Sequence, residues 1–218
     1  MVKRDFIKRN PTPFHNKFTF IGISLSPLAT ADSGIAVMDK DLNILRIDKF
    51  YNIEDFTQYL SCFGPCDSSV FCIDLPKNIA IVNGKWRYES RYTKMFKLRD
   101  HGENKFVWAE RFSDRGADFC DMLKGEGLDV YRHYSYFTKN SLDLLPPFKA
   151  RTPSAGRYLQ MTIEDKLNIK GIPPSFLALS GLDAVIAAYA AWKSVNTEEN
   201  KGFKILGDYK EIPIISAL

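Results

Sequence analysis

The sequence has no long apolar run, because nowhere in its 218 residues do 18 consecutive apolar side chains occur. A transmembrane helix needs about 20 such residues, so we expect no membrane-spanning segment and no membrane partner. The most apolar stretch, Phe176 to Trp192, is interrupted by serine, glycine and aspartate. The basic start of the chain also lacks the apolar core of a secretory signal peptide.

Cysteine and the common catalytic motifs are scarce as well. With 4 cysteines and no secretory signal, we expect reduced thiols and a cytoplasmic protein. The sequence has neither a Gly-rich nucleotide-binding loop nor a Gly-x-Ser-x-Gly motif. Its histidines, His15, His101 and His133, are isolated in sequence. Triad hydrolases and zinc enzymes of the His-x3-His type are therefore excluded.

The composition is that of a globular protein with one core. Hydrophobic residues make up 45% of the chain and charged residues 26%, and no linker rich in proline, glycine or serine divides it. We predict a basic N-terminal tail over residues 1–16 and a single domain over residues 17–218. The net charge of +4 is compatible with a polyanionic partner such as nucleic acid.

The first part of the chain predicts closely spaced strands. Short apolar segments indicate strands at Thr19–Ser24, Ser33–Met38 and Asn43–Asp48, which together predict an antiparallel meander. Helical spacing follows at Glu54–Phe63, and Ser69–Ile73 has the pattern of a buried strand.

The rest of the chain alternates helices and strands around a long irregular segment. That segment, Lys77–Val107, interleaves basic and aromatic residues, and compact domains seldom keep so long a loop without a functional reason. The predicted elements after it are a helix at Phe112–Leu123, a strand at Leu128–Tyr131, helices at Pro153–Leu167 and Ser180–Trp192, and a hairpin or closing extended segment around Gly207-Asp208. The fold class is therefore α/β, with a mixed central sheet in which parallel strands follow the meander.

Asp74 is the first candidate for chemistry. It stands at the end of the predicted strand Ser69–Ile73, and ligands in open α/β sheets gather beyond the carboxyl ends of strands. A carboxylate there is well placed to hold a cation. The alternative is an aspartate that opens a turn before Leu75-Pro76.

Asp183 is the second candidate, since it lies among apolar residues in an alanine-rich helix. A carboxylate in such surroundings must be paired, bound to a metal or placed at the helix end. The alternative is a capping arrangement with Ser180 as N-cap and Asp183 in the first turn, which is compatible with the first role.

Several motifs together resemble those of the DUF429 family. They are Ile21-Gly22-Ile23-Ser24, Ile73-Asp74-Leu75-Pro76, Val130-Tyr131-Arg132-His133-Tyr134, Leu182-Asp183-Ala184-Val185-Ile186-Ala187-Ala188-Tyr189 and Leu206-Gly207 followed by Ile212-Pro213. That family is regarded as predicted nucleases with an RNase H-like fold. The resemblance spans about residues 18–215 and implies the same fold here.

The resemblance also implies four convergent acids, of which this chain keeps two. The second and fourth fall on Asp74 and Asp183, whereas the first falls on Ser24 and the third on Arg132. We therefore expect a degenerate metal site for Mg²⁺ or Mn²⁺, formed by Asp74, Asp183 and Ser24. Two-metal nucleases hold their ions with clustered carboxylates, so half of the expected ligands are missing. Arg132 is alternatively an ion-pair partner of Asp74 or Asp183.

Basic residues near these motifs are candidates for phosphate binding. Arg87 and Arg91 follow the Asp-Leu-Pro motif at a spacing that suits one face of a helical turn, and Lys149 and Arg151 precede the helix at Pro153. Arg132 is a further candidate, and Trp86, Tyr88 and Tyr92 can stack on bases. The alternative is a solvated basic surface with aromatic core contacts.

These observations predict a divalent-metal-dependent nuclease or phosphodiesterase of the RNase H-like superfamily with an incomplete acidic site. The losses at Ser24 and Arg132 favour an alternative, an inactive RNase H-like protein that binds nucleic acid or a protein partner. A plainer alternative is a globular protein that binds a small phosphorylated molecule.

Overall fold

The structure is a computed structural model. It describes residues 19–26, 32–61, 68–74, 79–82, 85–88, 116, 118–147, 152–209 and 212–218.

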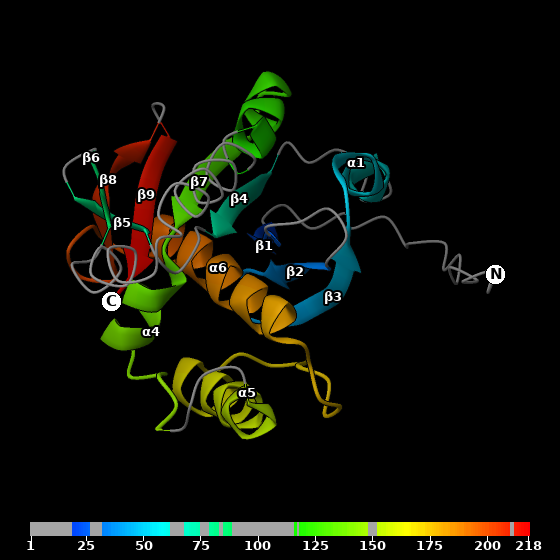
Figure 1. Cartoon of the computed structure of the whole chain (residues 1–218), viewed down its shortest axis with the longest axis vertical. Coiled ribbons are helices and arrows are strands. Elements are labelled where there is room, and N and C mark those ends of the chain that lie inside the picture. Colours follow the sequence, from blue (N-terminus) through cyan, green and yellow to red (C-terminus); the bar gives the residue numbers. More distant parts are fainter. Residues whose placement is uncertain are drawn as a thin grey trace, which may run out of the picture.

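A seven-stranded mixed sheet forms the centre of the fold (Figure 1). Its order is β3-β2-β1-β4-β7-β9-β8, in which β1 is antiparallel to β2 and parallel to β4, and β7 is parallel to both β4 and β9. The strands are β1 (Thr19–Ser24), β2 (Ser33–Asp39), β3 (Ile44–Phe50), β4 (Ser69–Asp74), β7 (Asp129–His133), β8 (Phe203–Tyr209) and β9 (Ile212–Ala217).

This sheet confirms the predicted mixed α/β architecture, a three-stranded antiparallel meander followed by parallel strands. The meander needs only a tight turn between β2 and β3, where the Asp39 carboxylate accepts hydrogen bonds from the backbone amides of Asp41 and Asn43. The final hairpin of β8 and β9 is also confirmed, although β8 runs through Gly207-Asp208 to Tyr209.

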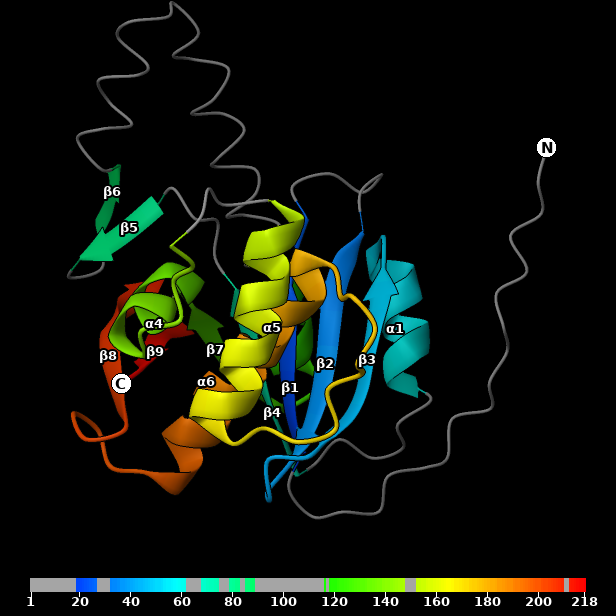
Figure 2. The same cartoon turned by 90° about the horizontal axis from the view of Figure 1, so that it is seen from below.

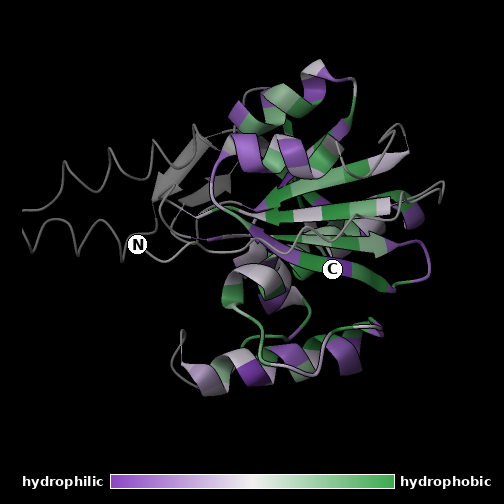
Figure 3. Ribbon diagram, turned by 90° about the vertical axis from the view of Figure 1, so that its right-hand side faces the viewer, coloured by the Kyte–Doolittle hydropathy of each residue, from purple (hydrophilic) through white to green (hydrophobic). Residues whose placement is uncertain are grey.

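Helices cover both faces of the sheet, and each face has its own apolar core. On one face α6 (Leu179–Asn196) lies directly on the sheet and α5 (Pro153–Leu167) packs outside it (Figure 2). On the other face lie α1 (Ile53–Ser61) and the helical residues 118–125. Figure 3 shows that hydrophobic residues concentrate on the strands between these layers. The hydrophobic effect therefore holds the sheet from both sides.

Two glycines let α6 approach the sheet closely. A Cβ added to Gly22 of β1 would lie 1.9 Å from the carbonyl oxygen of Ala184, and one added to Gly34 of β2 would lie 2.2 Å from that of Ser180. No side chain larger than hydrogen fits at either position. Because Gly34 pairs with Ser24, the first turns of α6 lie at the carboxyl end of β1.

The predicted helix boundaries are confirmed in part. The predicted bounds of α5 are confirmed: Thr152 caps the helix by accepting a hydrogen bond from the Ala155 amide, and Asn168 in the left-handed region is its C-cap. The capping arrangement at Ser180 is wrong, because α6 begins at Leu179 with Ala178 as its N-cap. One short helix, α4 (Ser135–Ser141), is not predicted from the sequence.

The segment after Asp74 contains a small second sheet. Strands β5 (Ile79–Val82) and β6 (Lys85–Tyr88) form an antiparallel pair, so Arg87 lies on a strand and the expected helical turn is wrong at that position. Among the described residues, none of the helices combines the length and apolarity needed to cross a membrane.

Candidate active site

Three polar side chains form a row at the carboxyl ends of adjacent parallel strands. Asp74 pairs with His133 across β4 and β7, and Ser24 follows Ile23, whose partner on β4 is Ile73. Ser24, Asp74 and His133 therefore stand side by side on β1, β4 and β7. All three are buried, and strand alternation turns them toward α6, because Phe20 and Cys72 of the same parity lie in the core under that helix.

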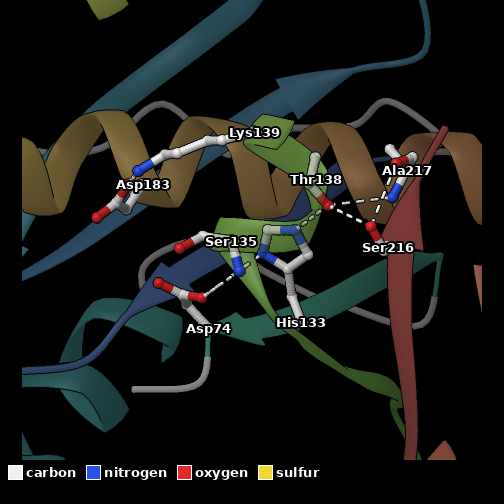
Figure 4. Close-up of polar contacts among 8 residues, drawn as sticks. All are labelled: Asp74, His133, Ser135, Thr138, Lys139, Asp183, Ser216 and Ala217. Atoms are coloured by element: carbon white, nitrogen blue, oxygen red, sulfur yellow. Dashed lines mark hydrogen bonds and ion pairs between the residues drawn. The ribbon is translucent and has the colours of Figure 1, made fainter. Parts of the chain in front are cut away.

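Asp183 reaches the same region from α6. It directly precedes Ala184, which touches Gly22, so it lies near the carboxyl end of β1. Figure 4 shows the carboxylates of Asp183 and Asp74 on one side of this region. The structure thus brings together the predicted residues Ser24, Asp74 and Asp183, which we call the acidic site.

A buried lysine neutralises Asp183. The Nζ atom of Lys139, on α4, forms an ion pair with the Asp183 Oδ1 atom, and both side chains are only 7% exposed. In Figure 4 the lysine side chain extends from α4 along α6 to the carboxylate. A buried charge needs such a partner, which explains how α6 accommodates an aspartate among its apolar residues.

Asp74 is held by α4 through different contacts. Its Oδ1 atom accepts a hydrogen bond of 3.1 Å from the backbone amide of Ser135, and it lies 3.7 Å from Nδ1 of His133. The Ser135 hydroxyl is buried without a hydrogen-bond partner among the described residues. The sharp passage from β7 into α4 therefore orients this carboxylate.

His133 belongs to a chain of buried polar groups that we call the polar relay, formed by His133, Thr138, Ser216 and Ala217. The His133 Nε2 atom lies 2.7 Å from the Thr138 hydroxyl, which lies 3.0 Å from that of Ser216. Burial lowers the pKa of His133 to about 3, and the nearby charge of Lys139 adds to this. The imidazole is therefore neutral at pH 7.

Arg132 lies on the opposite face of the sheet. It alternates with His133 along β7, it is fully buried, and a Cβ added to Gly116 would lie 2.2 Å from its Nη2 atom. Burial raises the pKa of nearby Cys120 to about 11, and the charge of Arg132 opposes this rise. The expectation that Arg132 faces the acidic pair is therefore corrected, because a strand of period two turns it away.

The other predicted phosphate-binding residues are not placed at this site. The structure gives only the backbone of Arg87, on β6, and Arg91, Lys149 and Arg151 lie outside the described residues. Asp32, which lies just before β2, forms an ion pair with Lys49 at 2.5 Å and is partly exposed, so it is a surface charge.

Two residues at the site, Lys139 and His133, are not predicted from the sequence. Lys139 lies in a seven-residue helix whose buried positions are Ser135, Thr138 and Lys139, so its inward face is polar and gives no apolar period. His133 is the last residue of β7 and directly follows Arg132. Val130 and His133 have opposite parity on β7, so their side chains lie on opposite faces of the sheet. Once the face of Val130 is known, this alternation places His133 on the face of α6.

The described side chains offer few donor atoms for a divalent cation. Asp74 offers carboxylate oxygen beside a buried imidazole nitrogen that has no hydrogen-bond partner among the described residues. Asp183 is already compensated by Lys139. Within the described ranges, no group of three or more histidine, cysteine, aspartate or glutamate side chains is close enough to hold a metal.

Comparisons with known proteins show no family for this chain. No family model matches the chain, and no curated protein matches its sequence, so the resemblance to the DUF429 family stays a prediction. Among solved structures, one similar chain is that of T. thermophilus RuvC in complex with Holliday junction substrate. The TM-score is 0.41 at 13% identity, over 81% of this chain and 95% of that chain.

Proposed function

We propose that this protein hydrolyses phosphodiester bonds of nucleic acid with one divalent cation, Mg²⁺ or Mn²⁺, held at Asp74. The observation that carries the proposal is the row of Ser24, Asp74 and His133 at the ends of three parallel strands, with Asp183 beside it on α6. Open α/β sheets bind ligands just beyond the carboxyl ends of their strands, which is where these side chains lie. A cation there polarises a phosphoryl oxygen and lowers the pKa of bound water.

The protein's own groups supply orientation and charge. The Ser135 amide donates a hydrogen bond to Asp74 Oδ1 and so fixes the orientation of this carboxylate. Lys139 forms an ion pair with Asp183 and so places an ammonium group in the site. Preorganised charge of this kind stabilises the negative charge that grows on phosphate oxygens during hydrolysis.

The charges of these residues favour a single cation. Two carboxylates and one ammonium leave the described part of the site with one net negative charge, since His133 is neutral. One divalent cation and one phosphodiester group together bring the site to neutrality. A second divalent cation would add two uncompensated positive charges in buried surroundings, which is costly.

We propose that Arg87, Arg91, Lys149 and Arg151 bind the phosphate backbone, with Ser24 completing the acidic site. Arginine forms bidentate hydrogen bonds with phosphate, and such contacts position a nucleic acid without reading its sequence.

A cleavage assay on single-stranded, duplex and hybrid substrates tests the proposal. We expect cleavage with Mn²⁺ or Mg²⁺ that stops with a chelator and falls about a hundredfold or more in Asp74→Asn, the effect of removing one preorganised group. The control is Asp143→Asn, because Asp143 is exposed and pairs with Lys166 at 2.5 Å on the surface. Equal cleavage by Asp74→Asn and the wild type would sink the proposal.

The buried pair of Lys139 and Asp183 favours a second candidate function, a protein that binds nucleic acid without cleaving it. That function predicts no cleavage on any substrate, together with binding that weakens as salt rises. Loss of that binding in Arg87→Ala and Arg91→Ala would support it, and absence of binding at low salt would contradict it.

A further inference from the structure

His133 is a titratable side chain that lies beside Asp74. The imidazole is fully buried, and Asp74 and His133 are partners across β4 and β7. Their nearest polar atoms, Oδ1 and Nδ1, are 3.7 Å apart. Whether Nδ1 faces this carboxylate as a hydrogen-bond donor or as an acceptor depends on which imidazole nitrogen carries the proton.

The polar relay favours one protonated nitrogen. The Ser216 hydroxyl lies within hydrogen-bond reach of the Ala217 carbonyl oxygen and of the Thr138 hydroxyl, and we assign its one proton to the carbonyl, which can only accept. The Thr138 hydroxyl thus donates to Ser216, and it accepts from the backbone amide of Ala217. Its contact with His133 must then be a second accepted bond, with Nε2–H as the donor. The Nδ1 atom therefore carries a lone pair and no proton.

This lone pair faces a carboxylate. Nδ1 is buried without a hydrogen-bond partner among the described residues, and Asp74 Oδ1, which lies 3.7 Å from it, is also an acceptor. A buried acceptor left without a donor costs about 1–3 kcal/mol. Two acceptors that converge are stabilised when a cation stands between them, because both then donate electron pairs to it.

We propose that His133 Nδ1 and Asp74 together bind one divalent transition metal of the Mn²⁺ or Zn²⁺ class, in preference to Mg²⁺. Imidazole nitrogen suits transition metals, whereas Mg²⁺ prefers sites made wholly of oxygen. The Nε2–H bond to Thr138 is the outer contact that fixes the ring of a metal-binding histidine. This inference rests on the proposed function and narrows its cation.

The test is Mn²⁺ binding to the 218-residue chain, which calorimetry and pulsed electron paramagnetic resonance measure. We expect one Mn²⁺ per chain, tighter binding than Mg²⁺, and modulation from a directly bound ¹⁴N nucleus. His133→Gln should remove the nitrogen signal and weaken Mn²⁺ binding by about tenfold or more. His133→Asp should reverse the preference toward Mg²⁺, because the pair then offers only oxygen.

The outcomes separate the two proposals. If Mn²⁺ binds and Asp74→Asn abolishes binding, but no ¹⁴N modulation appears, His133 is not a ligand and only this inference is overturned. If neither Mn²⁺ nor Mg²⁺ binds the wild type, the proposed function is overturned as well. The spectrum of the wild type decides the matter even where the His133 variants fail to fold, which circular dichroism reveals.

Discussion

Asp74 and Asp183 lie in the same region and are both buried, yet the two carboxylates have different partners. Asp183 is held by the ammonium group of Lys139, whereas Asp74 accepts a backbone amide and faces an imidazole lone pair. An internal cation makes Asp183 part of the folded core. The contacts of Asp74 instead orient a carboxylate for a ligand. An acidic site therefore becomes partly structural when one of its carboxylates forms a buried ion pair with a lysine.

The largest expected effect breaks the ion pair of Asp183. Lys139→Met keeps the shape of the side chain but leaves a buried carboxylate uncompensated, so we expect the free energy of unfolding to fall by about 3–5 kcal/mol. Urea denaturation measures this loss. The double variant Lys139→Met with Asp183→Leu should recover most of it, because no buried charge then remains. A single variant as stable as the wild type would show that the pair is not structural.

Asp74→Asn should change activity much more than stability. Asparagine keeps an oxygen that accepts from the Ser135 amide, so the free energy of unfolding should change by no more than about 1 kcal/mol. Cleavage should nevertheless fall about a hundredfold. Thermal denaturation and the cleavage assay, run on one preparation, measure both. A loss of stability as large as that of Lys139→Met would remove the difference between the two carboxylates.

Gly22→Ala should separate the two acids. The added methyl group meets the backbone of Ala184, so α6, which carries Asp183, must move away from the strand beside Asp74. We expect a loss of about 1–3 kcal/mol in the free energy of unfolding, together with weaker Mn²⁺ binding. Gly125→Ala is the control, because nothing lies within 4 Å of the Cβ it would add. Equal effects of the two variants would contradict the close packing of α6.

The smallest effect concerns binding without chemistry. Arg87→Ala should weaken nucleic-acid binding and reduce the magnitude of its salt dependence by about one in log–log slope, as expected for one lost phosphate contact. Asp74→Asn should leave that slope unchanged. Filter binding at several salt concentrations measures both variants. An unchanged slope in Arg87→Ala would exclude this residue from the phosphate contacts.

Much of the fold was predictable because it follows local patterns. The alternating and apolar segments at Thr19–Ser24, Ser33–Asp39 and Ser69–Asp74 specify strands within a residue or two, and Thr152 before Pro153 marks the start of α5. The helix α4 was missed because its buried residues are polar. Arg132 was expected at the site because a motif aligned by residue type does not report which face of the strand each residue occupies.

The sequence by itself determined the order of the strands of the central sheet, the long helices and the two aspartates, because apolar periodicity and isolated carboxylates are visible along the chain. Only the tertiary structure decided what surrounds those aspartates. Lys139 meets Asp183 across 44 residues, and His133 meets Asp74 only because β7 pairs with β4 in one register. Such partners depend on the packing of distant elements and on strand parity, which set the charge and the donor atoms of the site.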